Sequence, residues 1–315
     1  MTDLLLPALV LVPLVGAGVA LIQPRGGPVV TMVVAAAVLA TVARLASEVL
    51  RSGALDHAAG GWGAPYGIVL RVDGPALLLL AVTAVIGACI TLYAVPYFRP
   101  SPVRPDDRGV RYFWPLWLLV WAALNAIYIS TDLFNLYVCL ELVTLPAVGL
   151  VALEGTRAAV AAAIRYLLLS LMGSLAFLLG IVVVYSGAGT LSLPALAAAP
   201  LDPGAARLAL TFMTLGLAAK AALFPLHFWL PPAHASAPAP ASAVLSGLVV
   251  KAAFYIALRI WIEPFQGAFA TAGPVVLGTL GATAVLWGSV MALRQTRVKL
   301  IIAWSTVAQL GYLFL

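Results

Sequence analysis

The sequence predicts an all-α polytopic membrane protein with about ten transmembrane helices. The 315-residue chain is 63% hydrophobic and 9% charged, whereas soluble domains have about 25% charged residues. Its apolar runs are continuous and about 20 residues long, roughly twice the length of the alternating segments of a β-barrel. A chain this apolar cannot cover a water-facing surface, and disorder needs low hydrophobicity. These observations exclude a soluble globular enzyme, a disordered chain and a β-barrel.

Each predicted span is an apolar run that ends at a cluster of Pro, Gly or charged residues. The first run follows Met1-Thr2-Asp3, which lacks the positive segment of a signal peptide, so we expect this span to be retained. The stretch 187–205 is predicted to be an external loop with a short surface helix. In chain order, the predicted spans are 4–22, 28–47, 75–97, 113–130, 133–153, 163–186, 206–225, 240–262, 273–293 and 299–315.

Basic residues predict the orientation. Loops on one side hold ten of the 17 Lys and Arg residues, and loops on the other side hold four. The ten are Arg25, Arg99, Arg104, Arg108, Arg111, Arg157, Arg165, Arg294, Arg297 and Lys299, and the four are Arg51, Arg71, Arg207 and Arg259. By the positive-inside rule, the N-terminus is expected outside, in a cell (inner or plasma) membrane.

Several classes of ligand have no pattern in the sequence. The net charge of +6 does not predict nucleic-acid binding, because the arginines lie between apolar runs rather than on one polar face. Cys89 and Cys139 lie within apolar runs, which favours a packing role. No phosphate loop, dinucleotide fingerprint or catalytic triad spacing appears. We therefore expect neither a cofactor nor a metal site.

Three ionisable residues lie deep in predicted spans, where each costs at least about 2.5–3.5 kcal/mol. They are Glu141 in the fifth span, Lys220 in the seventh and Lys251 in the eighth. Arginine fills 14 of the 17 basic positions, yet both deep bases in the later spans are lysine, which can lose a proton when it is desolvated. This pattern predicts a proton relay. The alternatives are a protonated glutamate that joins two helices, a snorkelling lysine and a fixed ion pair.

The seventh span is predicted to end in a broken helix at residues 224–232, a few residues beyond Lys220. Pro225, Pro231 and Pro232 interrupt the helical pattern, and irregular backbone beside a buried charge is typical of transporters. His227 and His234 flank this break and could carry protons at physiological pH. A structural, hydrogen-bonded histidine is an equally good interpretation of each.

Four segments resemble the antiporter-like, proton-translocating membrane subunits of respiratory complex I, of multisubunit Na⁺/H⁺ antiporters (their D subunit) and of membrane-bound hydrogenase 4. They are 132–138 followed by Glu141, 220–234, 237–247 followed by Lys251, and 302–312. The resemblance runs from about residue 60 to the end. It implies that Glu141 modulates the charge of Lys220, that Lys220 is the central proton carrier and that Lys251 passes protons onward.

The resemblance also implies a domain organisation. Residues 1–112 would hold the first three helices, residues 113–262 a complete five-helix antiporter-like repeat (spans four to eight), and residues 263–315 the start of a second repeat. Members of the family have two inverted repeats, so we expect this chain to be a C-terminally truncated form. The exit half of the proton path is not assigned.

The expected function is proton translocation as a subunit of a complex I-like NADH:quinone oxidoreductase, a hydrogenase or a cation/proton antiporter complex. The alternatives are a role in a monovalent cation/H⁺ antiporter with no redox link and a truncated, non-conducting scaffold. Expected partners are other membrane subunits, the lipid bilayer and H⁺, with Na⁺ as a second candidate ion. Any oxidoreductase activity would belong to partner subunits, because the chain has no ligands for a redox centre.

Overall fold

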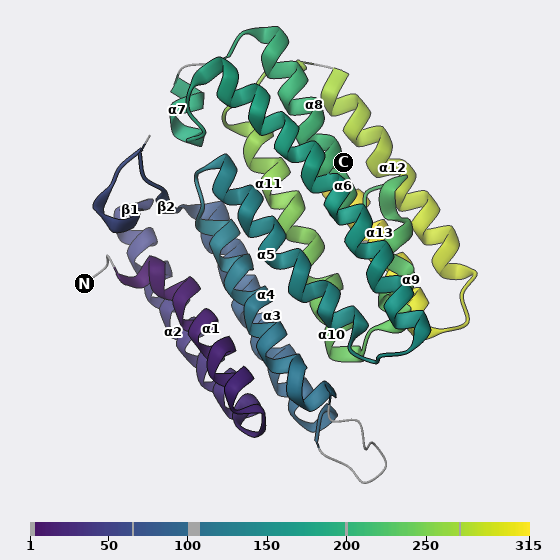
Figure 1. Ribbon diagram of the computed structural model, residues 1–315. Coiled ribbons are helices and arrows are strands. Elements are labelled where there is room, and N and C mark those ends of the chain that lie inside the picture. Colours follow the sequence, from purple (N-terminus) through teal and green to yellow (C-terminus); the bar gives the residue numbers. More distant parts are fainter. Residues whose placement is uncertain (1–3, 65, 100–107, 199–200, 271) are drawn as a thin grey trace.

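The computed structural model describes residues 4–64, 66–99, 108–198, 201–270 and 272–315. Long helices lie side by side in one bundle, with a short hairpin at one end (Figure 1). Among the described residues, eight helical segments are long and apolar enough to cross a membrane. The predicted all-α membrane class is confirmed. The count of ten spans and the repeat organisation stay predictions, and Arg104 lies outside the described residues.

The hairpin connects the second and third helices at one end of the bundle. Strands β1 and β2 pair antiparallel, with Leu55 opposite Val72. Helix α3 begins at Gly74, and the side chain of Asp73 caps it by accepting a hydrogen bond from an amide of its first turn. The elements are α1 (Leu5–Ile22), α2 (Gly27–Ser52), β1 (Leu55–Ala58), β2 (Val69–Val72) and α3 (Gly74–Tyr97), with 3-10 turns at Pro24–Gly26 and Ala59–Gly61.

Helix α4 forms the centre of the bundle. Trp114, Trp117 and Trp121 are fully buried on it, and the last two rings stack with centroids 5.0 Å apart. The elements of this central part are α4 (Arg108–Ile129), α5 (Leu133–Ala152), α6 (Arg157–Ala188), α7 (Leu193–Ala198) and α8 (Pro203–Lys220). Helix α7 is the short helix that was expected between residues 187 and 205.

The last part of the chain contains the irregular backbone. A 3-10 turn, η4 (Leu226–Trp229), leads into α9 (Leu230–Ser236). A π-helical turn, η5 (Leu245–Val249), joins α10 (Ala239–Val244) to α11 (Val250–Ile262), and these three form one candidate span. The chain continues with α12 (Ala272–Leu293) and α13 (Val298–Leu313).

Several helices differ in length from the sequence prediction. Helix α2 runs to Ser52 rather than to residue 47, because Arg44 and Glu48 form an i,i+4 pair at 3.4 Å that supports a polar final turn. Helix α6 begins at Arg157 rather than at residue 163, because the hydroxyl of Thr156 caps it. The predicted 206–225 helix ends at Lys220. Polar ends of α2 and α6 were thus underestimated, whereas the end of α8 was placed too late.

Connections on one side of the bundle meet at a common end. A bridge joins Leu70 of the hairpin to Ser130, and another joins Asp132 to Ser192, just before α7. We call this the hairpin end. The opposite end, where α5 joins α6 and α9 joins α10, is called the break end, because α9 follows the break in that direction (Figure 1). The N-terminal side of α1 lies at the hairpin end. Which end faces the cytoplasm stays a prediction.

Candidate functional site

Lys220 and Glu141 form an ion pair between α8 and α5, in which the lysine is buried and the glutamate partly exposed. The Nζ atom of Lys220 lies 3.1 Å from Glu141 Oε1 and donates to Thr144 Oγ1 at 2.9 Å. The Lys220 side chain is 5% exposed and that of Glu141 is 23% exposed. Thr144 lies one turn beyond Glu141, on the same face of α5. Two of the three ionisable residues that the sequence singles out are therefore in contact.

Helix α6 supplies an uncharged partner for Glu141. The hydroxyl of Ser174 donates to Glu141 Oε1 and lies 3.0 Å from the carbonyl of Ser170. A hydroxyl carries one proton, so Ser174 can donate to the carboxylate or to the backbone, but not to both at once. Sequence reasoning missed Ser174 and Thr144. The sequence signal that was available for them is a hydroxyl residue three or four positions from another polar residue within an apolar helix.

The close approach of α6 and α8 brings these groups together. A Cβ atom added at Gly216 would lie 2.2 Å from the carbonyl oxygen of Gly173, and one added at Gly173 would lie 2.8 Å from that of Gly216. Each glycine therefore permits a backbone contact that any larger residue would prevent. This contact lies one turn before Lys220 on α8, so it sets how far Lys220 stands from α6.

The helix break begins at the ion pair. Helix α8 stops at Lys220, and Ala222 takes a left-handed conformation with φ of 54°. The indole of Trp229 closes the turn by donating to the carbonyl of Ala219 at 3.0 Å, and it stacks on Tyr166 of α6 with ring centroids 4.2 Å apart. Ala221, Ala222 and Leu223 are buried, so the start of the irregular segment is enclosed by protein, whereas Phe228 of η4 is 57% exposed.

The three prolines assigned to the break have different positions. Pro225 lies within the irregular segment, directly before η4. Pro231 and Pro232 lie in the first turn of α9, where a proline lacks only an amide that has no helical partner. The break is therefore a short non-helical turn followed by a new helix, rather than a long irregular stretch.

His227 lies at the break end and faces α13. Its ring stacks on Phe224 and meets Trp304 edge-on, with centroids 5.4 Å away in each case. The Nδ1 atom is buried and has no partner at hydrogen-bond distance within the described part of the chain. His227 and Gln295 also line a cavity of about 410 Å³ between η4, α9, α12 and α13. This cavity could connect the break to water.

His234 is fully buried and belongs to a different group of residues. Its Nδ1 atom lies 2.7 Å from the hydroxyl of Ser242, and its Nε2 atom has no hydrogen-bond partner among the described residues. Lys251 and Lys299 are within electrostatic range of the ring. The ammonium group of Lys299 donates to the carbonyl of Ala237 at 2.8 Å.

Lys251 follows the π-helical turn directly. Its Nζ atom donates to the carbonyl oxygen of Ser246, which lies inside that turn. Ser242, the partner of His234, is four residues before Ser246, so the two serines lie on one face. The ammonium group of Lys220 binds Glu141 and Thr144, and that of Lys251 binds the carbonyl of Ser246, so the two lysines have no partner in common among the described residues. The sequence did not predict the π-helical turn, which is often found at functional sites.

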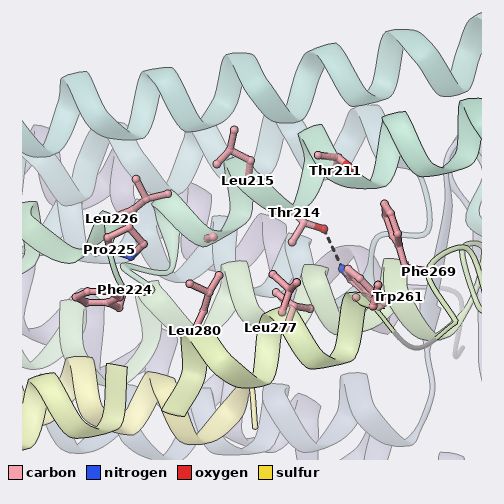
Figure 2. A pocket seen from close by; sticks show the side chains of 14 residues that line it. Thr211, Thr214, Leu215, Phe224, Pro225, Leu226, Trp261, Phe269, Leu277 and Leu280 are labelled. Atoms are coloured by element: carbon pink, nitrogen blue, oxygen red, sulfur yellow. Dashed lines mark hydrogen bonds between the residues drawn. The ribbon is translucent and has the colours of Figure 1, made fainter. Parts of the chain in front are cut away.

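An apolar cavity of about 380 Å³ lies on the other side of α8 (Figure 2). Phe224, Pro225 and Leu226 of the break line one end, and the hydrogen bond from Trp261 Nε1 to Thr214 Oγ1, 2.9 Å long, lies at the other end. Neither Lys220 nor Glu141 lines this cavity. Helix α8 thus presents its ion pair to α5 and α6 and an apolar surface to α12.

Comparisons with known proteins identify relatives of this chain. The model of the family described as NADH:quinone oxidoreductase/Mrp antiporter, TM, matches residues 130–315. The chain is 38% identical over 290 residues to NADH-quinone oxidoreductase subunit N of Desulforudis audaxviator, an alignment that covers 89% of this chain and 56% of that protein. It is 28% identical over 272 residues to the D subunit of the Na⁺/H⁺ antiporter of Alkalihalophilus pseudofirmus, covering 85% and 54%. The chain spans about half the length of these curated relatives.

Two solved structures have a similar fold. A chain of the archaeal membrane-bound sulfane sulfur reductase superposes with a TM-score of 0.87 at 28% identity, over 97% of this chain and 63% of that one. A chain of the Mrp complex from Dietzia sp. gives a TM-score of 0.87 at 28% identity, over 98% and 57%. The protein thus belongs to the family of NADH:quinone oxidoreductase and Mrp antiporter transmembrane subunits.

Proposed function

We propose that the chain translocates protons across the membrane as one subunit of a larger complex. The observation that carries this proposal is the ion pair between Lys220 and Glu141, buried beside a broken helix. Placing ionisable groups inside a membrane-spanning region costs free energy, so such a pair indicates a functional role. The identity to subunits of a quinone oxidoreductase and of a cation antiporter supports the same activity.

The pair works as a switch in this proposal. While Glu141 is ionised and 3.1 Å from Lys220, its charge favours the protonated amine. Ser174 and Lys220 both contact Glu141 Oε1, so the carboxylate can keep its serine partner when it moves away from the lysine. Lys220 then keeps only the uncharged hydroxyl of Thr144 and is poised to release its proton. Arginine could not serve in this position, because it stays protonated in proteins.

Lys251 is proposed to receive the proton next, as the third member of the relay. His234 and its neighbours Ser242 and Ser246 form a polar group beside Lys251. His227 and His234 would connect the relay to water at the break end, which we place in the cytoplasm, with the N-terminus outside. The cavity beside His227 supports an entry on that side.

The source of energy depends on partner subunits. We propose that other membrane subunits bind this chain, as they do in the multisubunit complexes that its relatives are named for. A redox-linked complex and a cation/proton antiporter would use the same three residues. Membrane vesicles that hold the complex distinguish them: proton movement on addition of NADH indicates a redox link, and movement driven by an imposed Na⁺ or K⁺ gradient indicates antiport.

The relay is tested by proton uptake into liposomes that contain the purified complex. Lys220→Ala and Glu141→Ala should each reduce uptake severely, while assembly on native gels stays unchanged. Lys220→Arg keeps the positive charge but should fail as well, because arginine does not release its proton. Glu48→Gln is the matched control, because it removes a carboxylate of similar exposure, 22%, from a pair with Arg44 on α2, away from the proposed relay.

Two results separate this proposal from its alternative. Wild-type uptake by both alanine variants would contradict the relay. If the wild-type complex moves no protons under either energy source, the chain is a non-conducting scaffold and its ion pair is structural. A severe loss for Lys220→Arg with normal assembly supports a function that needs a lysine which can be deprotonated.

A further inference from the structure

One face of α11 carries polar side chains from Lys251 to the hairpin end. Lys251, Tyr255 and Arg259 are spaced four residues apart and therefore lie on the same face of the helix. Glu263 follows at the same spacing, just beyond the end of α11. The distance along the helix from Lys251 to Glu263 is roughly 18 Å at 1.5 Å per residue. This face extends from the relay toward the hairpin end.

The far end of this face is a cluster of charges. Arg259 is buried, donates to Asp73 at the start of α3, and lies 3.0 Å from Glu263 Oε1 through its Nε atom. One guanidinium is thus shared by two carboxylates. The Glu263 side chain is 34% exposed, so it reaches water while Arg259 does not. Arg71 of the hairpin also acts electrostatically on Glu263.

Hydroxyl groups lie between Lys251 and this cluster. Tyr255 donates to the carbonyl of Tyr128 at 2.9 Å, which leaves its own oxygen free to accept a hydrogen bond. The hydroxyls of Tyr128 and Thr83 are buried and interact with each other, and neither has another hydrogen-bond partner within the described residues. Buried polar groups without a protein partner are the usual sites of ordered water.

We propose that this face of α11 is a proton exit toward the hairpin end, with Glu263 as the terminal acceptor. The inference rests on the proposed function. The proton leaves the ammonium group of Lys251 and passes along the hydroxyls of Tyr255 and Tyr128 and their bridging waters. It then binds the Glu263 carboxylate and is released to solvent. Lys251 ends neutral and ready to be protonated again.

The electrostatics of Glu263 suit a proton acceptor. Partial burial raises the pKa of this carboxyl above its usual value of 4.5, and Asp73 raises it further, whereas Arg259 and Arg71 lower it. Burial has the largest effect. An acceptor that binds protons more readily than a surface carboxylate, yet touches water, can take up a proton from the interior and return it to solvent.

Cysteine labelling tests this exit without requiring transport. Thr83→Cys and Thr91→Cys are prepared in a background in which Cys89 and Cys139 are replaced by serine. Both threonines are buried on α3, but Thr91 accepts a hydrogen bond from Trp117 at 3.1 Å and has no place on the proposed path. In nanodiscs, a small charged methanethiosulfonate should modify Thr83→Cys an order of magnitude faster than Thr91→Cys. Equal rates would overturn the exit.

Proton flux through the liposome-reconstituted complex provides the second measurement. Tyr255→Phe and Glu263→Gln should each slow proton release severalfold, whereas Asp202→Asn, which alters an exposed carboxylate at the same end, should not. If Lys220→Met abolishes flux while Tyr255→Phe and Glu263→Gln match the wild type, the exit is wrong and the relay stands. If Lys220→Met conducts normally, the relay itself fails, and the exit falls with it whatever the labelling result.

Discussion

Removing one member of the Lys220–Glu141 pair should cost more stability than removing both. Glu141→Gln keeps the shape of the side chain and its contact with Ser174, but it removes the negative charge and leaves the ammonium group of Lys220 with uncharged hydrogen-bond partners only. Two unit charges 3.1 Å apart attract by roughly 5 kcal/mol at an effective dielectric constant near 20. Breaking a buried pair by removing one partner typically costs about 3–5 kcal/mol. Partial exposure of Glu141 favours the lower limit.

A double-mutant cycle measures this coupling. The free energy of unfolding is determined in mixed micelles for the wild type, Glu141→Gln, Lys220→Met and the double variant. We expect each single variant to lose about 3 kcal/mol and the double variant to lose less than either single variant, because it buries no unpaired charge. Single losses below about 0.5 kcal/mol that simply add would show that the two groups are not coupled, and would refute the description of the site as a tight ion pair.

Three further predictions concern the scaffold around the site. Gly216→Ala should destabilise the protein by about 1–3 kcal/mol in the same unfolding assay, because its Cβ would meet the carbonyl of Gly173, whereas Gly278→Ala, with open space around it, should have little effect. Trp229→Phe removes a buried hydrogen bond to the backbone of α8 and should cost about 1–3 kcal/mol, seen as a lower Tm. Burial raises the pKa of Asp132 above 3.8, so the folded state binds its proton more tightly, and the Tm of the wild type should fall as pH rises from 3.8 through that higher pKa. Asp132→Asn should lack this part of the pH dependence, and an unchanged slope would contradict the assignment.

The helices were predictable because hydrophobic runs and their breaks are local properties of the chain. Glu141, Lys220 and Lys251 could be singled out for the same reason. A charged residue within an apolar run is recognisable from the local sequence, without knowing which residues surround it in space. Their pairing was only partly predictable. The contact between Glu141 and Lys220 depends on how α5, α6 and α8 cross, and the chain separates the two residues by 79 positions.

Other features depend on packing that no local pattern reveals. Thr144 and Ser174 are common residues in membrane helices, and only their positions relative to Glu141 give them a role. The end of α8 at Lys220 was predicted five residues too late, because the turn is closed by Trp229, whose indole bonds to the backbone from nine residues beyond the helix end. Tertiary contacts, rather than Pro225, determine where that helix stops.

The π-helical turn before Lys251 has a consequence for the rotational register of α11. This turn contains one residue more than an α-helical turn, and each residue rotates a helix by about 100°. Deleting one residue between Leu245 and Val249 would therefore rotate every later side chain about the helix axis by roughly that angle. Lys251 and Arg259 would leave their present partners together, without any change in their own identity. The one additional residue of the π-helical turn thus sets the direction in which the whole polar face of α11 points.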